Sequence, residues 1–271
     1  MVTTTTVKRI YLELTNTCNL ACPFCLKTQR STAELPLNLV EKIMRQSQNL
    51  CDYLYLHVQG EPLLYPRIAE VLALADKYQR QIQLVTNGTL LKEKQELLLK
   101  TKALRKIAIS LQGLFLAENL TDKLTDLAEF LQAAKATKVI VELRFWGNNP
   151  AITTYLKERY SYSVTQGSKR QVDDRLFINY QKQFDWPSLN PAVQRQNTYC
   201  IGPSLMLCVL SNGTITPCCL DVEGRLSLGN IQNSSLSEAL INPRYLSLIR
   251  GFQDNKVLEL LCQHCNYGDI T

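Results

Sequence analysis

Two alternating patterns of apolar and polar residues run along the first half of the chain. Apolar and polar side chains alternate over residues 8–14, which predicts a strand, and residues 36–50 carry apolar side chains at helical spacing. The alternation of strand and helix predicts a parallel sheet with helices packed outside it. Further strands are predicted over 53–58, 81–85, 106–110, 139–145 and, after a less regular stretch, 176–180, and further helices over 66–80, 90–100 and 120–137.

The repeat alone does not separate a flat, doubly wound sheet from a barrel. In both folds the loops after the strands meet at the carboxyl edge of the sheet, where ligands bind. Polar motifs stand at those positions, and each by itself is an ordinary turn sequence. Together they predict a binding site at that edge: Gly60-Glu61-Pro62, Thr86-Asn87-Gly88 and Ser110-Leu111-Gln112-Gly113 follow the second, third and fourth strands, and Arg144 lies near the end of the fifth.

The last quarter of the chain has a different pattern. From Cys200 two strand-like runs flank Asn212-Gly213, a pair typical of a tight hairpin turn. A helix is predicted over residues 236–251. We therefore divide the chain into a larger unit, 1–195, and a smaller hairpin-plus-helix unit, 196–271.

Composition narrows the class of protein. The chain has 271 residues, 45% of them hydrophobic, which is ample for a buried core. The 30 basic and 24 acidic residues are dispersed, so the net charge of +6 favours a solvated surface and predicts no nucleic-acid partner. A mildly basic groove would suit an acidic peptide or a phosphorylated metabolite. No signal peptide and no apolar run of about 20 residues is found, so we expect no membrane association and a cytoplasmic location.

Ten cysteines are many for a chain of this size, and in a reducing cytoplasm they favour metal or cluster ligation over disulfides. Cys18, Cys22 and Cys25 form a C-x3-C-x2-C run directly after the first strand. Three such thiolates can bind three irons of a cubane cluster and leave the fourth iron open to a small molecule. The alternative is a zinc site, whose nearest further ligands, Cys51 and His57, lie in or beside strand-like sequence.

At this spacing the cysteine run resembles the signature of the radical S-adenosylmethionine (radical SAM) superfamily. The resemblance implies a [4Fe–4S] cluster whose open iron binds the amino and carboxylate groups of S-adenosylmethionine (SAM). An electron from the cluster then cleaves SAM to methionine and a 5′-deoxyadenosyl radical, which abstracts a hydrogen atom from a substrate. The resemblance also favours the partial (β/α)6 TIM-type barrel of that superfamily over a flat sheet.

The same resemblance implies that the loops after the strands contact SAM. Arg144 is expected to pair with the methionine carboxylate, because a guanidinium fork suits a carboxylate; its alternative role is a salt bridge at the barrel rim. The other expected contacts are Gly60 and Glu61 at the amino group, Pro62 and Thr86 in the same loops, Asn87 and Ser110 near the ribose and methionine, and Phe24 behind the adenine.

Four cysteines near the end of the chain form a second group. Cys200 and Cys218 bracket the hairpin, and Cys262-Gln-His-Cys265 closes the chain. This arrangement resembles the twitch domain, a short form of the SPASM auxiliary iron–sulfur domain. The resemblance implies a second, auxiliary [4Fe–4S] cluster that passes an electron to or from the substrate radical. A zinc ribbon is the alternative, since C-x2-C pairs are common there.

Two classes of substrate remain open for such an enzyme. Twitch and SPASM enzymes modify ribosomally made peptides, which we favour by a small margin, or oxidise a sugar or cyclitol, and the whole chain resembles small members of the second kind. A peptide would need a separate recognition protein, because the first strand begins near residue 8. Either reaction needs an external one-electron reductant of flavodoxin or ferredoxin type. An epimerase would also need a hydrogen donor, for which Cys208 and Cys219 are candidates. A non-enzymatic electron carrier or scaffold is disfavoured, because the first cluster lacks a fourth protein ligand.

Overall fold

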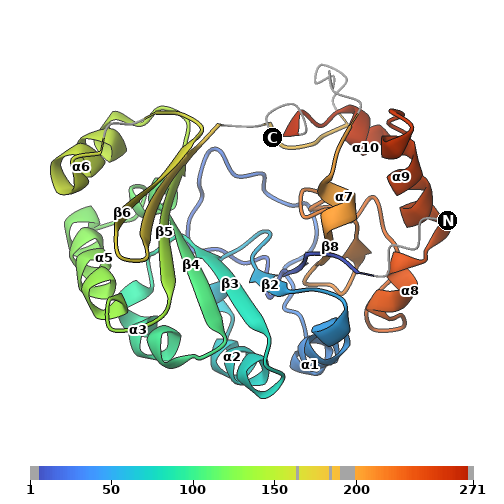
Figure 1. The fold of residues 1–271 in the computed structure, drawn as a ribbon, viewed down its shortest axis with the longest axis horizontal. Coiled ribbons are helices and arrows are strands. Elements are labelled where there is room, and N and C mark those ends of the chain that lie inside the picture. Colours follow the sequence, from blue (N-terminus) through green and yellow to red (C-terminus); the bar gives the residue numbers. More distant parts are fainter. Residues whose placement is uncertain (1–5, 163–164, 183–184, 190–198, 268–271) are drawn as a thin grey trace.

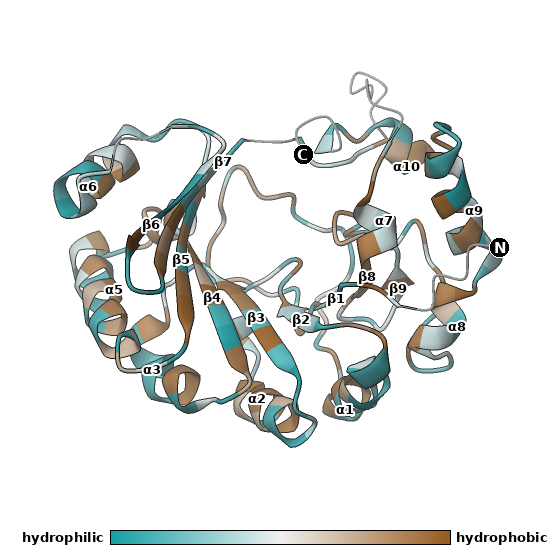
Figure 2. Ribbon diagram, in the orientation of Figure 1, coloured by the Kyte–Doolittle hydropathy of each residue, from teal (hydrophilic) through white to brown (hydrophobic). Residues whose placement is uncertain are grey.

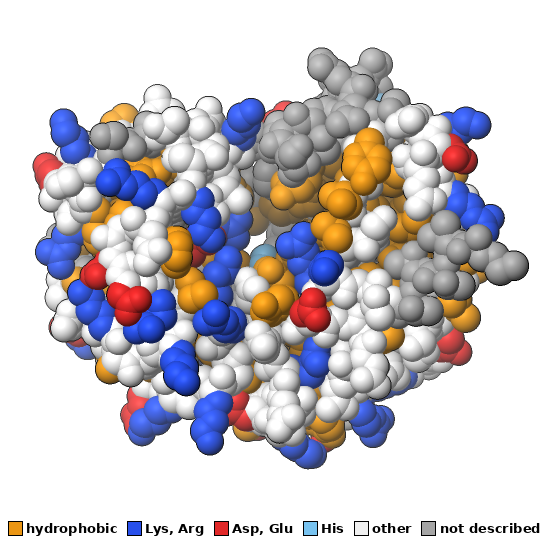
Figure 3. Space-filling model, in the orientation of Figure 1, with side chains coloured by type: hydrophobic (Ala, Val, Ile, Leu, Met, Phe, Trp, Pro, Cys, Tyr) orange, Lys and Arg blue, Asp and Glu red, His pale blue; other side chains and the backbone are white. Residues whose placement is uncertain are grey.

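The computed structural model describes residues 6–162, 165–182, 185–189 and 199–267. Their strands form one sheet that curves as an open barrel (Figure 1), and the surface is hollowed where the sheet curves (Figure 3). The strands are β1 (Arg9–Leu12), β2 (Tyr53–Leu56), β3 (Gln81–Thr86), β4 (Leu104–Ser110), β5 (Ile140–Trp146), β6 (Ser168–Asp173), β7 (Leu176–Gln181), β8 (Met206–Val209) and β9 (Ile215–Thr216). Their order across the sheet is β6-β7-β5-β4-β3-β2-β1-β8-β9.

Helices cover the convex side of this sheet, and Figure 2 shows the apolar residues concentrated in the strands and on patches of the surrounding helices. None of the described helices is long and apolar enough to cross a membrane. The helices are α1 (Leu37–Gln46), α2 (Ile68–Lys77), α3 (Leu91–Lys100), α4 (Leu111–Leu114), α5 (Leu120–Ala134), α6 (Pro150–Tyr160), α7 (Gly202–Leu205), α8 (Leu236–Leu240), α9 (Pro243–Gln253) and α10 (Leu260–Gln263), with short 3₁₀ turns η1 (Ser47–Asn49) and η2 (Pro62–Leu64).

The two faces of the strands differ in what they carry. On β2, Leu54 and Leu56 are fully buried against the helices, whereas Tyr55 between them faces the hollow and is only half-buried. Successive side chains of a strand point to opposite faces, so each strand contributes one set to the core and the other set to the hollow. The inward set on β4 and β5 includes the charged residues Lys106 and Glu142, which is unusual for a parallel sheet.

The sheet confirms the predicted α/β class with a partial barrel. Each strand and helix predicted up to β5 is present. Neighbouring strands from β1 to β5 pair in parallel, and β7 pairs in parallel with β5. Strand β6 was not predicted. It pairs antiparallel with β7 at the edge of the sheet. Its sequence, Ser-Lys-Arg-Gln-Val-Asp, is mostly exposed, so it lacks the apolar alternation that marks a half-buried strand.

The C-terminal unit is attached directly to the barrel. The predicted hairpin is β8–β9, and β8 pairs in parallel with β1, so this unit extends the same sheet. The predicted helix over 236–251 is two helices, α8 and α9, because Pro243 disfavours helical geometry at Asn242, which caps α9. The predicted boundary between residues 195 and 196 lies outside the described residues.

Candidate active site

The cysteine loop leaves β1 at the carboxyl edge of the sheet. Thr15 and Glu34 pair at its neck, and the loop presents the exposed thiols of Cys18 and Cys25 with the half-buried Cys22 between them. Burial, and then the neighbouring thiols, raise the pKa of Cys22 to about 11. A thiolate is the form that ligates metal. Because its pKa is raised, the thiol of Cys22 loses its proton readily only beside a cation such as iron.

The loop after β2 is held tightly against the cysteine loop. Gly60 has a φ of +72°, and a Cβ atom at this position would lie 2.4 Å from the carbonyl oxygen of Thr15 and 2.7 Å from that of Thr17. The backbone N–H of Glu61 donates to the Thr17 carbonyl at 2.8 Å. Only glycine tolerates both the positive φ and this close approach, so Gly60 sets the distance between the two loops.

Glu61 acts inside the protein rather than towards the cysteine loop. Its carboxylate is 1% exposed and accepts hydrogen bonds from Thr86 Oγ1 (2.8 Å) and from the backbone N–H groups of Asn87 (2.7 Å) and Leu63 (3.1 Å). Burial outweighs these hydrogen bonds and raises its pKa to about 7. The Glu61 side chain therefore links the loop after β3 to the loop after β2. Because its carboxylate is already hydrogen-bonded, a ligand here would contact the backbone of the loop.

Side chains from the same two loops reach the cysteines. Asn87 Nδ2 lies 3.8 Å from Cys18 Sγ and donates to Asn19 Oδ1 at 2.8 Å. Gln59 Oε1 lies 3.8 Å from Cys25 Sγ. Gln59 is 6% exposed, and its Nε2 has no hydrogen-bond partner among the described residues. Gln59 was missed in the sequence, where it reads as the residue before a turn; its buried free amide fits a polar ligand at this edge.

The remaining expected SAM contacts lie around the ends of β4 and β5. The ring of Phe24 packs edge-on against Trp146 at 5.8 Å between centroids, and the Phe24 carbonyl accepts from Trp186 Nε1 at 3.1 Å. Ser110 ends β4 beside Arg144 in the strand register. Arg144 donates to Gln181 Oε1 at 2.6 Å, and its Nε lies 3.8 Å from Glu142 Oε1.

The cysteine loop is joined to β1 by a buried ion pair that the sequence analysis missed, and the hairpin unit hydrogen-bonds to both members of that pair. Arg30 donates to Glu13 Oε1 at 2.6 Å and to the Val222 carbonyl at 2.7 Å. Glu13 is fully buried and also accepts from the Ser211 hydroxyl and from the backbone of Gln59. The signal was present, because Glu13 is a charged residue within the apolar strand pattern of residues 8–14.

Two cysteines of the second group, Cys200 and Cys218, lie at the opposite end of β8 from the cysteine loop. Strand β9 runs back beside β8, so Cys218 comes level with the amino end of β8, and Cys200 precedes that end. Cys200 Sγ lies 3.3 Å from where a Cβ of Gly202 would sit. Burial, and then the thiol of Cys219, raise the pKa of Tyr267, which follows Cys265 by two residues.

The two candidate hydrogen donors differ in their access to the hollow. Cys208 is fully buried on β8, and burial raises the pKa of its thiol far above the usual value. Cys219 is half-buried and close enough to Tyr11, on the inward face of β1, to raise the pKa of that phenol after burial has done so. Of the two thiols, that of Cys219 is the more accessible.

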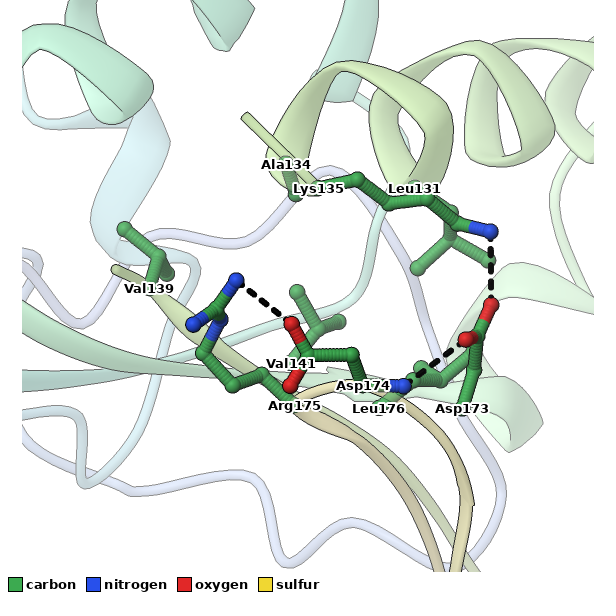
Figure 4. Close-up of a pocket in the computed structure, with 9 residues that line it drawn as sticks. All are labelled: Leu131, Ala134, Lys135, Val139, Val141, Asp173, Asp174, Arg175 and Leu176. Atoms are coloured by element: carbon green, nitrogen blue, oxygen red, sulfur yellow. Dashed lines mark hydrogen bonds and ion pairs between the residues drawn. The ribbon is translucent and has the colours of Figure 1, made fainter. Parts of the chain in front are cut away.

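One small pocket lies away from all these residues (Figure 4). It is lined by the end of α5 and by Val141 and Leu176 at the amino ends of β5 and β7, and its volume is about 20 Å³. Ion pairs of Asp173 with Lys135 and of Arg175 with Asp174 cross its mouth. It has room for about one water molecule, so we assign it no part in the site.

Two models of known families match the chain. Residues 12–155 match the model of the radical SAM superfamily. The chain belongs to the radical SAM superfamily. Residues 200–266 match SPASM, an iron–sulfur cluster-binding domain. This radical SAM protein is accordingly an enzyme that uses two [4Fe–4S] clusters and SAM.

Several curated proteins are similar in sequence. The S-adenosyl-L-methionine-dependent 2-deoxy-scyllo-inosamine dehydrogenase of Niallia circulans is 21% identical over 265 residues, 95% of this chain and 92% of that protein. The GTP 3′,8-cyclase of Synechococcus sp. (strain CC9902) is 36% identical over 107 residues, and the PqqA peptide cyclase of Gluconobacter oxydans is 33% identical over 104 residues. These two matches span 38% and 37% of this chain but only 31% and 29% of the length of the two cyclases.

Solved structures share the fold over almost the whole chain. BtrN in complex with AdoMet and 2-DOIA superposes with a TM-score of 0.59 at 18% identity and covers 96% of this chain and 93% of BtrN. Streptococcus suis SuiB bound to precursor peptide SuiA superposes with a TM-score of 0.57 at 15% identity, covering 98% of this chain and 71% of SuiB.

The chemistry of the donor set fits an iron–sulfur cluster. Cys18, Cys22 and Cys25 lie on one loop, and the two outer thiols are close enough to contribute to the raised pKa of Cys22. In a cubane each thiolate binds a different iron, so three thiolates of one loop can hold three irons. The free amide of Gln59 beside Cys25 likewise suits a polar ligand such as SAM.

Proposed function

We propose that this enzyme abstracts a hydrogen atom from a ribosomally made precursor peptide held inside the barrel. The observation that carries the proposal is that Cys18, Cys22 and Cys25 follow β1 at the carboxyl edge of the sheet, whereas Cys200 and Cys218 flank the amino end of β8, so the inward face of the sheet runs between them. A substrate there would face SAM at one end and the auxiliary cluster at the other. Similarity to the PqqA peptide cyclase and the fold shared with peptide-bound SuiB support a peptide.

The proposal assigns roles to the residues. Cys18, Cys22 and Cys25 would hold the SAM-binding cluster, and Phe24, Gly60, Glu61, Pro62, Thr86, Asn87, Ser110 and Arg144 would line the SAM site. Cys200, Cys218, Cys262 and Cys265 would hold the auxiliary cluster. When bound, the first cluster and SAM supply a 5′-deoxyadenosyl radical.

The chain's own residues then bind, orient and shield. Gly60 and Glu61 hold two loops at a fixed distance from the cysteine loop, which keeps the SAM position rigid. Phe24 and Trp146 form an aromatic wall beside it that excludes water. Exclusion of water matters here because a carbon radical reacts with whatever hydrogen source reaches it.

A second candidate is oxidation or epimerisation of a sugar or cyclitol. The similarity to 2-deoxy-scyllo-inosamine dehydrogenase extends over nearly the full length of both proteins and favours the oxidation. The epimerisation would use Cys219 as hydrogen donor from its place beside Tyr11. We further propose a flavodoxin- or ferredoxin-type reductant, a separate peptide-recognition protein and a cytoplasmic location.

The first test is anaerobic reconstitution followed by iron and sulfide counting. Wild type should bind about eight irons and a Cys18/Cys22/Cys25→Ala variant about four. With dithionite and SAM, only wild type should release 5′-deoxyadenosine. The two substrate classes are then separated by offering peptides encoded beside the gene and a panel of cyclitols. Zinc in place of iron, or a fully loaded wild type that does not cleave SAM, would refute the proposal.

A further inference from the structure

The wall of the hollow carries an unbalanced group of charges. Lys106 Nζ lies 3.3 Å and Lys169 Nζ 2.7 Å from Glu142 Oε2, and Arg144 Nε lies 3.8 Å from Glu142 Oε1. Asn179 donates to the same carboxylate at 3.1 Å. The strand register places these side chains on the inward face of the sheet, and Figure 3 shows Lys and Arg side chains gathered along the hollow. Three cations therefore share one carboxylate.

Across the hollow, two more basic side chains have unused atoms. The Nε of Arg9 and the Nδ1 of His57 are buried without a hydrogen-bond partner among the described residues. Burial, and then the charges of Arg144, Lys106 and Arg9, lower the pKa of His57 to about 3. His57 thus lies where the fields of three cations meet, and it stays neutral there.

The carboxylate of Glu13, which follows β1, cannot neutralise these cations. Glu13 faces inward on the continuation of β1, but its oxygens are taken by Arg30, Ser211 and the backbone of Gln59. Glu142 itself already serves Lys106 and Lys169. Lys106 shares the single carboxylate of Glu142 with two other cations, and Arg9 lies over the neutral ring of Tyr55 at 5.7 Å. Incompletely neutralised charges are costly in a half-buried site, so this group gains from an anion that arrives with a ligand.

We propose that the residues Arg9, His57 and Lys106 bind an anionic group of the substrate, a carboxylate by first choice, within the hollow. This inference rests on the proposed function and deepens it, because it makes an acidic side chain of the peptide the group that orients it. The ammonium of Lys106 and the free N–H of Arg9 donate to the anion, and neutral His57 supplies a further donor. The carboxylate of SAM pairs at the cysteine edge, so it leaves Arg9 and Lys106 for the substrate.

The test measures binding of a small probe to the cluster-loaded enzyme with saturating SAM and no reductant. Saturating SAM fills its own carboxylate site, so the titration reports on the remaining cations. Succinate is titrated by calorimetry, with neutral succinamide as the matched control and inorganic phosphate as the second anion. Lys106→Met is compared with Lys100→Met, which makes the same change on an exposed lysine of α3 outside the barrel. Circular dichroism confirms that each variant is folded.

The proposal expects succinate to bind and succinamide not to bind. Lys106→Met should weaken succinate about tenfold or more, as expected for loss of a charge-assisted hydrogen bond, and Lys100→Met should leave it unchanged. Glu142→Gln should tighten succinate, because it removes the competing carboxylate. Phosphate that binds more tightly than succinate would replace the carboxylate with a phosphate as the recognised group.

Three results would overturn the inference. They are equal affinity for succinate and succinamide, equal loss in the Lys106 and Lys100 variants, and unchanged or weaker succinate binding in Glu142→Gln. The proposed function is tested by a separate measurement, the release of 5′-deoxyadenosine after dithionite is added. SAM cleavage without selective succinate binding defeats only the anion site, whereas selective binding without SAM cleavage defeats only the radical chemistry.

Discussion

Replacing Gly60 with alanine tests whether the distance between two loops builds the SAM site. The new Cβ would lie 2.4 Å from the Thr15 carbonyl oxygen, and real Cβ atoms stay at least 3.0 Å from such neighbours. The loop after β2 must therefore retreat from the cysteine loop. Retreat breaks the 2.8 Å hydrogen bond from Glu61 N–H to the Thr17 carbonyl.

The cost can be estimated from two contributions. Alanine at a positive φ costs about 1 kcal/mol, and loss of the hydrogen bond costs about 0.5–1.5 kcal/mol. With displacement of the Thr15 carbonyl, we expect Gly60→Ala to destabilise the protein by about 2–3 kcal/mol in all. For a chain of this size that corresponds to a fall in melting temperature of roughly 5–12 °C.

Gly167 provides a matched control, because its φ is +80° but nothing lies within 4 Å of the place that a Cβ would occupy. Gly167→Ala should cost only the conformational term, about 1 kcal/mol, or roughly 2–4 °C. Both variants are melted anaerobically with clusters in place and assayed for the KM for SAM. Gly60→Ala should raise that KM and Gly167→Ala should not. Equal melting temperatures and equal KM values in the two variants would show that the close approach at Gly60 is unimportant.

Three further predictions concern the same site. Asn87→Ala removes the amide beside Cys18 and Asn19, and we expect a KM for SAM about tenfold higher, measured from 5′-deoxyadenosine release, with the iron content unchanged. Burial raises the pKa of Glu61 from 4.5 to about 7, so protonation of Glu61 stabilises the folded state fully below pH 4.5, and this stabilisation is lost as the pH rises through 7. Between pH 5 and pH 8, the free energy of unfolding in urea should therefore fall by about 2–3 kcal/mol more for wild type than for Glu61→Gln. If Cys219 quenches the substrate radical, Cys219→Ser should abolish deuterium uptake into product from D₂O, whereas Cys208→Ser should lower stability and leave that uptake intact.

The sequence predicted the strand face that packs on the helices better than the face that lines the hollow. Apolar residues at every second position of β1 to β5 identify the faces that pack on the helices, because burial demands them. The edge strand β6 has no such requirement and carries no pattern. The attachment of β8 to β1 was also beyond local pattern, because pairing of strands almost 200 residues apart depends on the whole sheet.

The site residues divide along the same line. Cys18, Cys22 and Cys25 are close in sequence, and their spacing alone indicates their chemistry. Gln59 and Arg30 act through partners on other segments, so only the folded chain brings Gln59 to Cys25 and Arg30 to Glu13 and Val222. Charged residues inside apolar strand patterns were the overlooked signal. They mark side chains that a parallel sheet would otherwise bury, and so they indicate a polar interior.

That polar interior has a consequence for how a substrate is held. Burial alone would raise the pKa of Glu142, but the hydrogen bond from Lys169 and the charge of Lys106 lower it to about 2. His57 stays neutral because its pKa is lowered to about 3. Neither group changes its charge between pH 5 and pH 8, so neither makes anion binding depend on pH over that range. Binding of succinate is then expected to weaken as its own carboxylates become protonated, which titrations at pH 5 and pH 8 measure.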